Sequence, residues 1–71
     1  MLEHYYYNLN TDQKGNHEVH RVDCSYLPVP QNREYIGIYT NCRDAIEKAK
    51  FITGKINFDG CYWCAKECHR G

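Results

Sequence analysis

The sequence predicts an α+β fold with a small three-stranded antiparallel sheet, one helix and a C-terminal C-x2-C knuckle. Three observations indicate this fold. Aromatic and β-branched residues gather in three short segments, a later segment has helical periodicity, and a pair of cysteines follows a glycine near the C-terminus. The 71 residues leave room for a single domain, residues 1–71, with one thin core.

The first two predicted strands form a hairpin. Residues 5–9 (Tyr-Tyr-Tyr-Asn-Leu) are dense in aromatic strand formers, and residues 18–22 make a short, mostly polar run that contains two valines. Between them, residues 11–16 hold Asp, Gly and Asn, which favour turns. We expect the second strand to be half exposed, and its end to lead through His20 to Cys24.

An extended connection leads to the third predicted strand. Pro28 and Pro30 exclude a regular helix or a central strand over residues 24–30, because each removes a backbone donor and restricts the residue before it. Residues 34–40 (Glu-Tyr-Ile-Gly-Ile-Tyr-Thr) are the strongest strand prediction in the chain. Gly37 inside this strand permits a bulge or a close backbone approach.

One helix is predicted over residues 42–53. Asn41 is a good N-cap, Asp44 suits the positive end of the helix dipole, and Gly54 stands where a C-terminal cap belongs. Apolar residues recur at helical spacing and form one stripe that we expect to face the sheet: Cys42, Ala45, Ile46, Ala49 and Ile52. A further helical turn is expected within residues 65–70.

Composition and charge exclude some classes of function. The chain is 42% hydrophobic and 25% charged, which is typical of a folded globular domain. Nine Lys and Arg balance nine Asp and Glu, so no net field draws the chain to nucleic acid or to an anionic membrane. No segment approaches the roughly 18 consecutive apolar residues of a membrane span.

The cysteines and the N-terminal residues bear on the compartment. Residues 1–7 have neither the basic start nor the apolar centre of a signal peptide. We therefore expect a cytoplasmic protein, whose five cysteines are reduced thiols or metal ligands rather than a disulfide framework. The odd number supports this expectation, because a closed disulfide scaffold favours an even number of cysteines.

Two half-sites supply a predicted set of metal ligands. His20 and Cys24 form an H-x3-C pattern, and Cys61 and Cys64 form a C-x2-C pattern directly after Gly60. A C-x2-C turn brings two thiolates to one ion at about 2.3 Å, and three thiolates with one neutral imidazole suit a tetrahedral Zn2+. We predict one structural Zn2+, which closes a long loop and leaves no position open for a catalytic water.

Three other residues leave alternatives open. Cys68 or His69 can replace one of the four ligands, and His69 is the stronger rival of His20. A histidine on a strand is more often a partly exposed surface residue than a ligand, which counts against His20. Cys42 lies on the apolar stripe of the predicted helix, where we expect it to pack as a small buried hydrophobe.

The surroundings of these half-sites resemble a known family pattern. Residues 19–27 (Val-His-Arg-Val-Asp-Cys-Ser-Tyr-Leu) are similar to its opening, [YV]-H-x3-C-x-[YW]-L. Residues 38–45 are similar to its step from strand to capped helix, and residues 60–64 (Gly-Cys-Tyr-Trp-Cys) to its close. The family is the zinc-binding N-terminal domain of Ada-type DNA-repair methyltransferases, with related short metal-binding modules attached to nucleases and other bacterial proteins. The resemblance covers residues 17 to 65.

The resemblance implies an architecture without implying the activity. It implies zinc on His20, Cys24, Cys61 and Cys64, with the helix packed over a small sheet. The first ligand is His where the Ada domain has Cys, so methyl-acceptor chemistry is not carried over. Basic residues of the family knuckle are replaced by Tyr and Trp, so DNA binding is not carried over either. The segment between helix and knuckle is also longer than in the family.

Aromatic residues indicate a binding function. A domain this small cannot bury all of its Tyr and Trp side chains, and exposed rings of these types serve recognition of proteins or nucleic acids. Individual rings can also simply cover the edge of the core. Because the net charge is zero, we expect a protein partner, and the leading prediction is a zinc-stabilised, non-catalytic binding module. The rings are Tyr5, Tyr6, Tyr7, Tyr26, Tyr35, Tyr39, Tyr62 and Trp63.

Three alternatives stand beside this prediction. A thiol-based redox or acceptor protein can use Cys61 and Cys64, but their motif does not open a helix within a βαβ unit, as in thioredoxin-like proteins. No set of nucleophile, base and acid is evident, so we expect no enzyme. A metal-free small domain remains an alternative, whereas a secreted disulfide mini-protein is disfavoured by the N-terminal sequence and the odd cysteine count.

Overall fold

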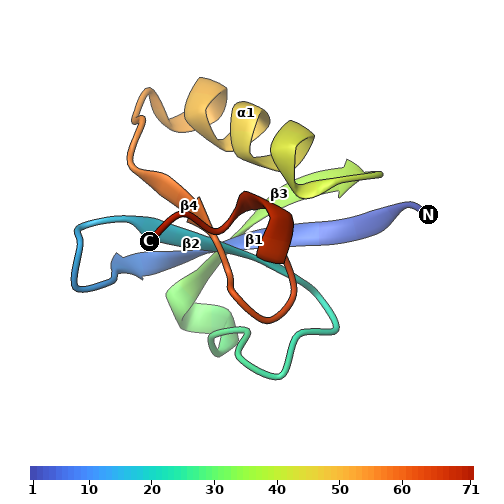
Figure 1. Cartoon of the computed structure of the whole chain (residues 1–71), viewed down its shortest axis with the longest axis horizontal. Coiled ribbons are helices and arrows are strands. Elements are labelled where there is room, and N and C mark those ends of the chain that lie inside the picture. The colour runs from blue at the N-terminus through green and yellow to red at the C-terminus, as the bar shows by residue number, and fades with distance from the viewer.

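A four-stranded sheet carries helix α1 on one of its faces (Figure 1). This computed structural model describes residues 1–71. The strands lie in the order β3-β1-β2-β4, and no helix is long and apolar enough to cross a membrane. The elements in chain order are β1 (Glu3–Thr11), β2 (His17–Arg21), a 3-10 turn (Pro30–Asn32), β3 (Arg33–Tyr39), α1 (Cys42–Thr53), β4 (Phe58–Gly60) and a second 3-10 turn (Lys66–Cys68).

Local chemistry produces the three antiparallel strands that the sequence predicts. The carboxylate of Asp12 accepts hydrogen bonds from the backbone N–H groups of Lys14 and Asn16, which fixes the turn between β1 and β2. Strand β1 is central to this part of the sheet, since it pairs antiparallel with both β2 and β3. The β1–β3 register shifts beside Gly37, whose φ of 151° favours glycine, so the predicted bulge is confirmed.

Strand β4 is the element that the sequence analysis did not predict. Its three residues pair parallel with β2, so that His17 lies opposite Phe58 and Val19 opposite Gly60. The pairing continues one residue further, where the N–H of Cys61 donates to the carbonyl of Val19 at 3.0 Å. The α+β fold is therefore confirmed, but the sheet has four strands and is mixed rather than three-stranded and antiparallel.

Helix α1 begins and ends where its caps predict. The side chain of Asn41 accepts a hydrogen bond from the N–H of Asp44 at 2.8 Å, and Gly54 ends the helix in the left-handed conformation. Ile52, which belongs to the predicted stripe, is exposed instead. The core lies between α1 and the sheet and consists of Tyr5, Tyr7, Val19, Ile36, Cys42, Ala45, Ala49 and Ala65.

The expectation that the second strand is half exposed was wrong. His17, Val19 and His20 on β2 are all buried, with 5%, 0% and 1% of their surfaces exposed. Strand β2 is an inner strand, because β4 covers the edge that a three-stranded sheet would leave open. His17 therefore lies beside the core against Tyr7 and Phe58, and His20 is buried on the face opposite α1.

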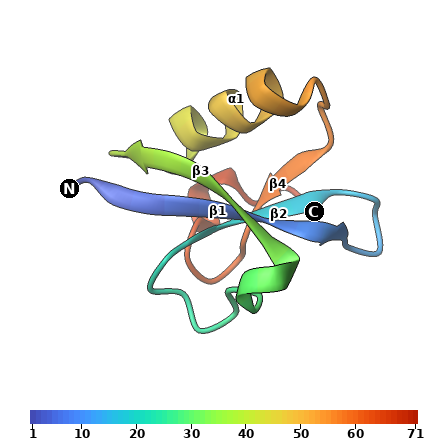
Figure 2. The same ribbon diagram turned by 180° about the vertical axis from the view of Figure 1, so that it is seen from behind.

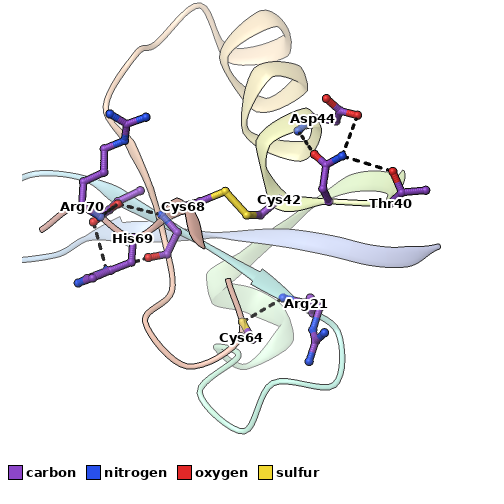
Figure 3. Close-up of a disulfide and its surroundings, with 11 residues drawn as sticks. Arg21, Thr40, Cys42, Asp44, Cys64, Cys68, His69 and Arg70 are labelled. Carbon is purple, nitrogen blue, oxygen red and sulfur yellow. Dashed lines mark hydrogen bonds and ion pairs between the residues drawn. A yellow bond between two sulfur atoms is a disulfide. The ribbon is translucent and has the colours of Figure 1, made fainter. Parts of the chain in front are cut away.

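A disulfide joins Cys42, at the start of α1, to Cys68 in the C-terminal turn (Figure 3). The predictions that Cys42 is an unpaired core residue and that all five cysteines are thiols or ligands were wrong for this pair. Cys42 is nevertheless buried, as expected. The sequence separation of 26 hides this pairing, because only the packing of the C-terminal segment against α1 brings the two sulfur atoms together.

Gly60 is required by close packing of the C-terminal segment. A Cβ at this position would lie 2.6 Å from the carbonyl oxygen of Ala65 and 2.6 Å from the Cβ of Cys68. We expect Gly60→Ala to lower the free energy of unfolding by about 2 kcal/mol, since backbone atoms must move to admit the methyl group. Urea unfolding measures the change. Gly15→Ala is the control, because a methyl group there strains the backbone, whose φ is positive, but meets no other atom. Equal losses in both variants would contradict this explanation.

Candidate metal centre

The parallel pairing of β2 and β4 brings the two half-sites together. Both strands end at the same side of the sheet, where β2 leads from His20 to Cys24 and β4 leads to Cys61 and Cys64. Neighbouring residues of a strand point to opposite faces, so Val19 enters the core beneath α1 while His20 points away from it. Figures 1 and 2 show the loops after β2 and β4 on the face of the sheet opposite α1.

The four predicted ligand residues form one cluster. One ligand atom from each of His20, Cys24, Cys61 and Cys64 lies within 4.8 Å of the others. The Sγ atoms of Cys24 and Cys61 are 3.9 Å apart, and the Sγ of Cys64 is 3.9 Å from Nδ1 of His20. Metal–sulfur bonds of about 2.3 Å place tetrahedral ligands roughly 3.8 Å apart. The cluster can therefore hold a metal ion.

Each of the three sulfur atoms also accepts a backbone hydrogen bond. The N–H of Tyr26 donates to Cys24, that of Trp63 donates to Cys61, and that of Arg21 donates to Cys64, over distances of 3.3 to 3.4 Å. Figure 3 shows the last of these bonds, on the opposite side of the strands from the disulfide. Because an N–H donor favours a charged acceptor, these bonds stabilise the thiolate form that a metal requires.

The imidazole of His20 has a different neighbour at each nitrogen. Nδ1 faces Cys64, whereas Nε2 is buried without a hydrogen-bond partner and lies 3.7 Å from the carboxylate of Glu18. Histidine ligands of metals usually give their second N–H to a carboxylate or a carbonyl, which fixes the ring. Glu18 is a residue that spacing arguments missed, although its place two residues before His20 puts both on one face of β2.

Burial sets the protonation of the metal-free cluster. Burial lowers the pKa of His20, so its ring is neutral and ready to bind a metal at neutral pH. Burial raises the pKa of the Cys61 thiol and, more strongly, that of the Cys64 thiol. A redox-active C-x2-C pair instead has a cysteine of lowered pKa. These shifts count against the redox use of Cys61 and Cys64.

Metal affinity is expected to rise steeply with pH. With raised pKa values the thiols of Cys61 and Cys64 hold their protons near neutral pH, and a metal that binds both must displace about two protons from this pair. The affinity should then increase up to roughly a hundredfold per pH unit from this pair below the two raised pKa values, while neutral His20 adds no proton to the balance. Competition with a chromophoric chelator at two pH values measures the slope. Release of fewer than two protons per metal would contradict binding by both Cys61 and Cys64.

The rival ligands lie outside the cluster. Cys68 is bound to Cys42 in the disulfide. The Nδ1 of His69 lies 3.0 Å from the carbonyl oxygen of Gly60 and 3.6 Å from the carboxylate of Asp59. Asp59 itself is buried and accepts backbone hydrogen bonds from residues 60, 70 and 71. His69 therefore belongs to the anchor of the C-terminal tail.

Three aromatic rings lie beside the cluster. Tyr26 and Trp63 are 59% and 66% exposed, and their rings stack with centroids 5.6 Å apart and planes 18° apart. Tyr62 packs edge-on against Trp63, at 4.9 Å between centroids. By contrast, Tyr5 and Tyr7 are buried in the core. The predicted surplus of surface aromatic residues is thus present at the knuckle, and we call Tyr26, Tyr62 and Trp63 the aromatic patch.

Comparison with protein-family models, with curated proteins and with solved structures gives no match to this chain. The resemblance to the Ada-type zinc domain therefore stays a prediction. The conclusion about this site rests on its geometry alone: a small α+β domain places one histidine and three cysteines where they can hold a metal ion.

Proposed function

We propose that the chain is a zinc-stabilised, non-catalytic binding module. The observation that carries this proposal is the convergence of His20, Cys24, Cys61 and Cys64 from two distant half-sites into one cluster. Chance rarely places three thiols and an imidazole within one coordination sphere, with a backbone N–H directed at every sulfur. The role is structural, since four protein ligands complete a tetrahedron and leave no position for substrate or water.

Zinc is the ion that the donor set favours. Thiolate and imidazole ligands in a tetrahedral arrangement suit Zn2+, whereas Mg2+ and Ca2+ need oxygen ligands. Zn2+ would be held by Nδ1 of His20 and by the three sulfur atoms, with Glu18 oriented toward Nε2. When bound, the ion would cross-link β2 and the loop after it to the knuckle.

The aromatic patch is the proposed binding surface, and the proposed partner is a protein. Exposed Trp and Tyr rings are common at the centres of protein interfaces, where each buries a large area at a small entropic cost. The backbones of Tyr26 and Trp63 are held by N–H bonds to the sulfur atoms of Cys24 and Cys61, and their rings stack on each other, which reduces the freedom that these two residues lose on binding. The balanced charge of the chain does not favour a nucleic-acid partner.

Native mass spectrometry before and after chelation tests the proposal. We expect one Zn2+ per chain, and we expect His20→Ala to weaken zinc binding by about a hundredfold or more, because it removes a direct ligand. His69→Ala is the matched control, since its ring contacts Gly60 and Asp59 outside the cluster. Loss of zinc from the His69 variant together with retention in the His20 variant would refute the ligand set.

A further inference from the structure

A cavity of about 620 Å³ lies between α1 and the C-terminal segment. It shares no residue with the metal cluster, which lies on the opposite face of the sheet. Its most reactive lining group is the disulfide, because Cys42 and Cys68 both border it. Ile46 and Phe58 supply apolar wall beside the disulfide. The cavity therefore gives a small molecule access to a sulfur–sulfur bond.

The charges around the cavity favour an anion. Arg43 and Arg70 border it and form no ion pair with any residue of the chain. Lys50 is neutralised by Glu47 at 3.7 Å, which leaves Glu67 as the one unpaired carboxylate. Figure 3 shows the Arg70 side chain reaching toward the level of α1 beside the disulfide. Two guanidinium groups can bind carboxylates through pairs of hydrogen bonds.

The two sulfur atoms of the disulfide differ in their surroundings. Cys42 is 1% exposed and lies in the first turn of α1, whereas Cys68 is only partly buried. An incoming thiolate therefore meets the sulfur of Cys68, and the electron pair leaves on the sulfur of Cys42. A thiolate in the first helical turn is stabilised by the helix dipole and by nearby cations, and a stabilised thiolate is a better leaving group.

We propose that this cavity binds small anionic thiols and that the Cys42–Cys68 disulfide undergoes thiol–disulfide exchange with them. In the first step a ligand thiolate bonds to Sγ of Cys68, the Cys42–Cys68 bond breaks, and Cys42 becomes a thiolate. In the second step another ligand thiolate attacks the ligand sulfur of this mixed disulfide. That step releases Cys68 as a thiolate and the ligand as its own disulfide. The protein gains the two electrons that the two thiols lose.

Reduction kinetics with thiols of opposite charge test this proposal. The folded, disulfide-bonded protein is treated with mercaptoacetate or with 2-aminoethanethiol. The reaction is quenched with acid, free thiols are alkylated, and the extent of reduction is measured by mass spectrometry. Each rate constant is divided by the rate constant of the same thiol with uncharged bis(2-hydroxyethyl) disulfide. This ratio corrects for the difference in intrinsic reactivity between the two thiols. We expect mercaptoacetate to be favoured about fivefold at low salt, with the preference falling as salt is added. The metal content is recorded throughout, because loss of the metal would unfold the domain and expose the disulfide to thiols of either charge.

Charge-removing variants locate the preference. Arg43→Gln combined with Arg70→Gln should abolish the preference for mercaptoacetate. Lys48→Gln is the matched control, since Lys48 is a cation of α1 that does not border the cavity. Equal normalised rates for both thiols in the unaltered protein would overturn the proposal. A limiting rate at high thiol concentration that is the same for both thiols would also overturn it, because reduction would then wait for unfolding.

Discussion

Chelation of the metal is expected to unfold this domain at 25 °C. The core contains only eight buried residues, so it supplies little stability by itself. Structural zinc in small domains contributes an apparent free energy of about 10–16 kcal/mol, which is comparable to the whole stability of a typical domain. Circular dichroism during thermal unfolding checks the result, and a fall in Tm of about 20 °C or more is expected on addition of a strong chelator.

The Cys61→Ser variant gives the same information without a chelator. Cys61 is 2% exposed and follows β4 directly, so its loss opens the cluster at the point where the knuckle joins the sheet. The disulfide remains intact in this variant, which separates the effect of the metal from that of the covalent link. A chelated protein that keeps a cooperative transition within a few degrees of the original Tm would show that the metal is not needed for folding.

Removal of the disulfide has the second largest expected effect. Replacement of both Cys42 and Cys68 by Ala should lower the free energy of unfolding by about 3 kcal/mol, because the 26-residue separation is no longer closed in the unfolded chain. Loss of the buried Cys42 sulfur adds a smaller packing cost. Chemical denaturation of the metal-loaded double variant measures the difference.

Metal content is the control for this double variant. Because the disulfide and the metal cluster lie on opposite faces of the sheet, the variant should still bind one metal ion per chain (Figure 3). A variant that unfolds with the same free energy as the unaltered protein would indicate that packing alone holds the C-terminal segment against α1. A variant without metal would indicate that the disulfide also positions the knuckle.

The sequence predicted those parts of the fold that local chemistry determines. Asn41 and Gly54 marked both ends of α1, because caps act within one helical turn. Strand β4 was missed, because three residues carry no periodicity and their parallel pairing with β2 joins segments about 40 residues apart. The burial of β2 was missed for the same reason, since it depends on β4.

The metal cluster was predictable and the disulfide was not. Ligand spacing within His20–Cys24 and Cys61–Cys64 reflects the small radius of one coordination sphere, which is a local constraint. Cys42 and Cys68 have no such local partners, and their pairing depends on where the C-terminal turn packs. Spacing also gives no information on outer contacts such as Glu18, which only the alternation of sides along β2 would suggest.

The backbone bonds from Tyr26 and Trp63 to the sulfur atoms of Cys24 and Cys61 link occupancy of the cluster to the shape of the surface. Coupling between two binding events is reciprocal. If the metal raises the affinity for a partner that requires the stacked rings, that partner raises the affinity for the metal by the same factor. Under the proposed function, this domain would therefore report metal supply, because scarcity of the ion would weaken binding of the partner.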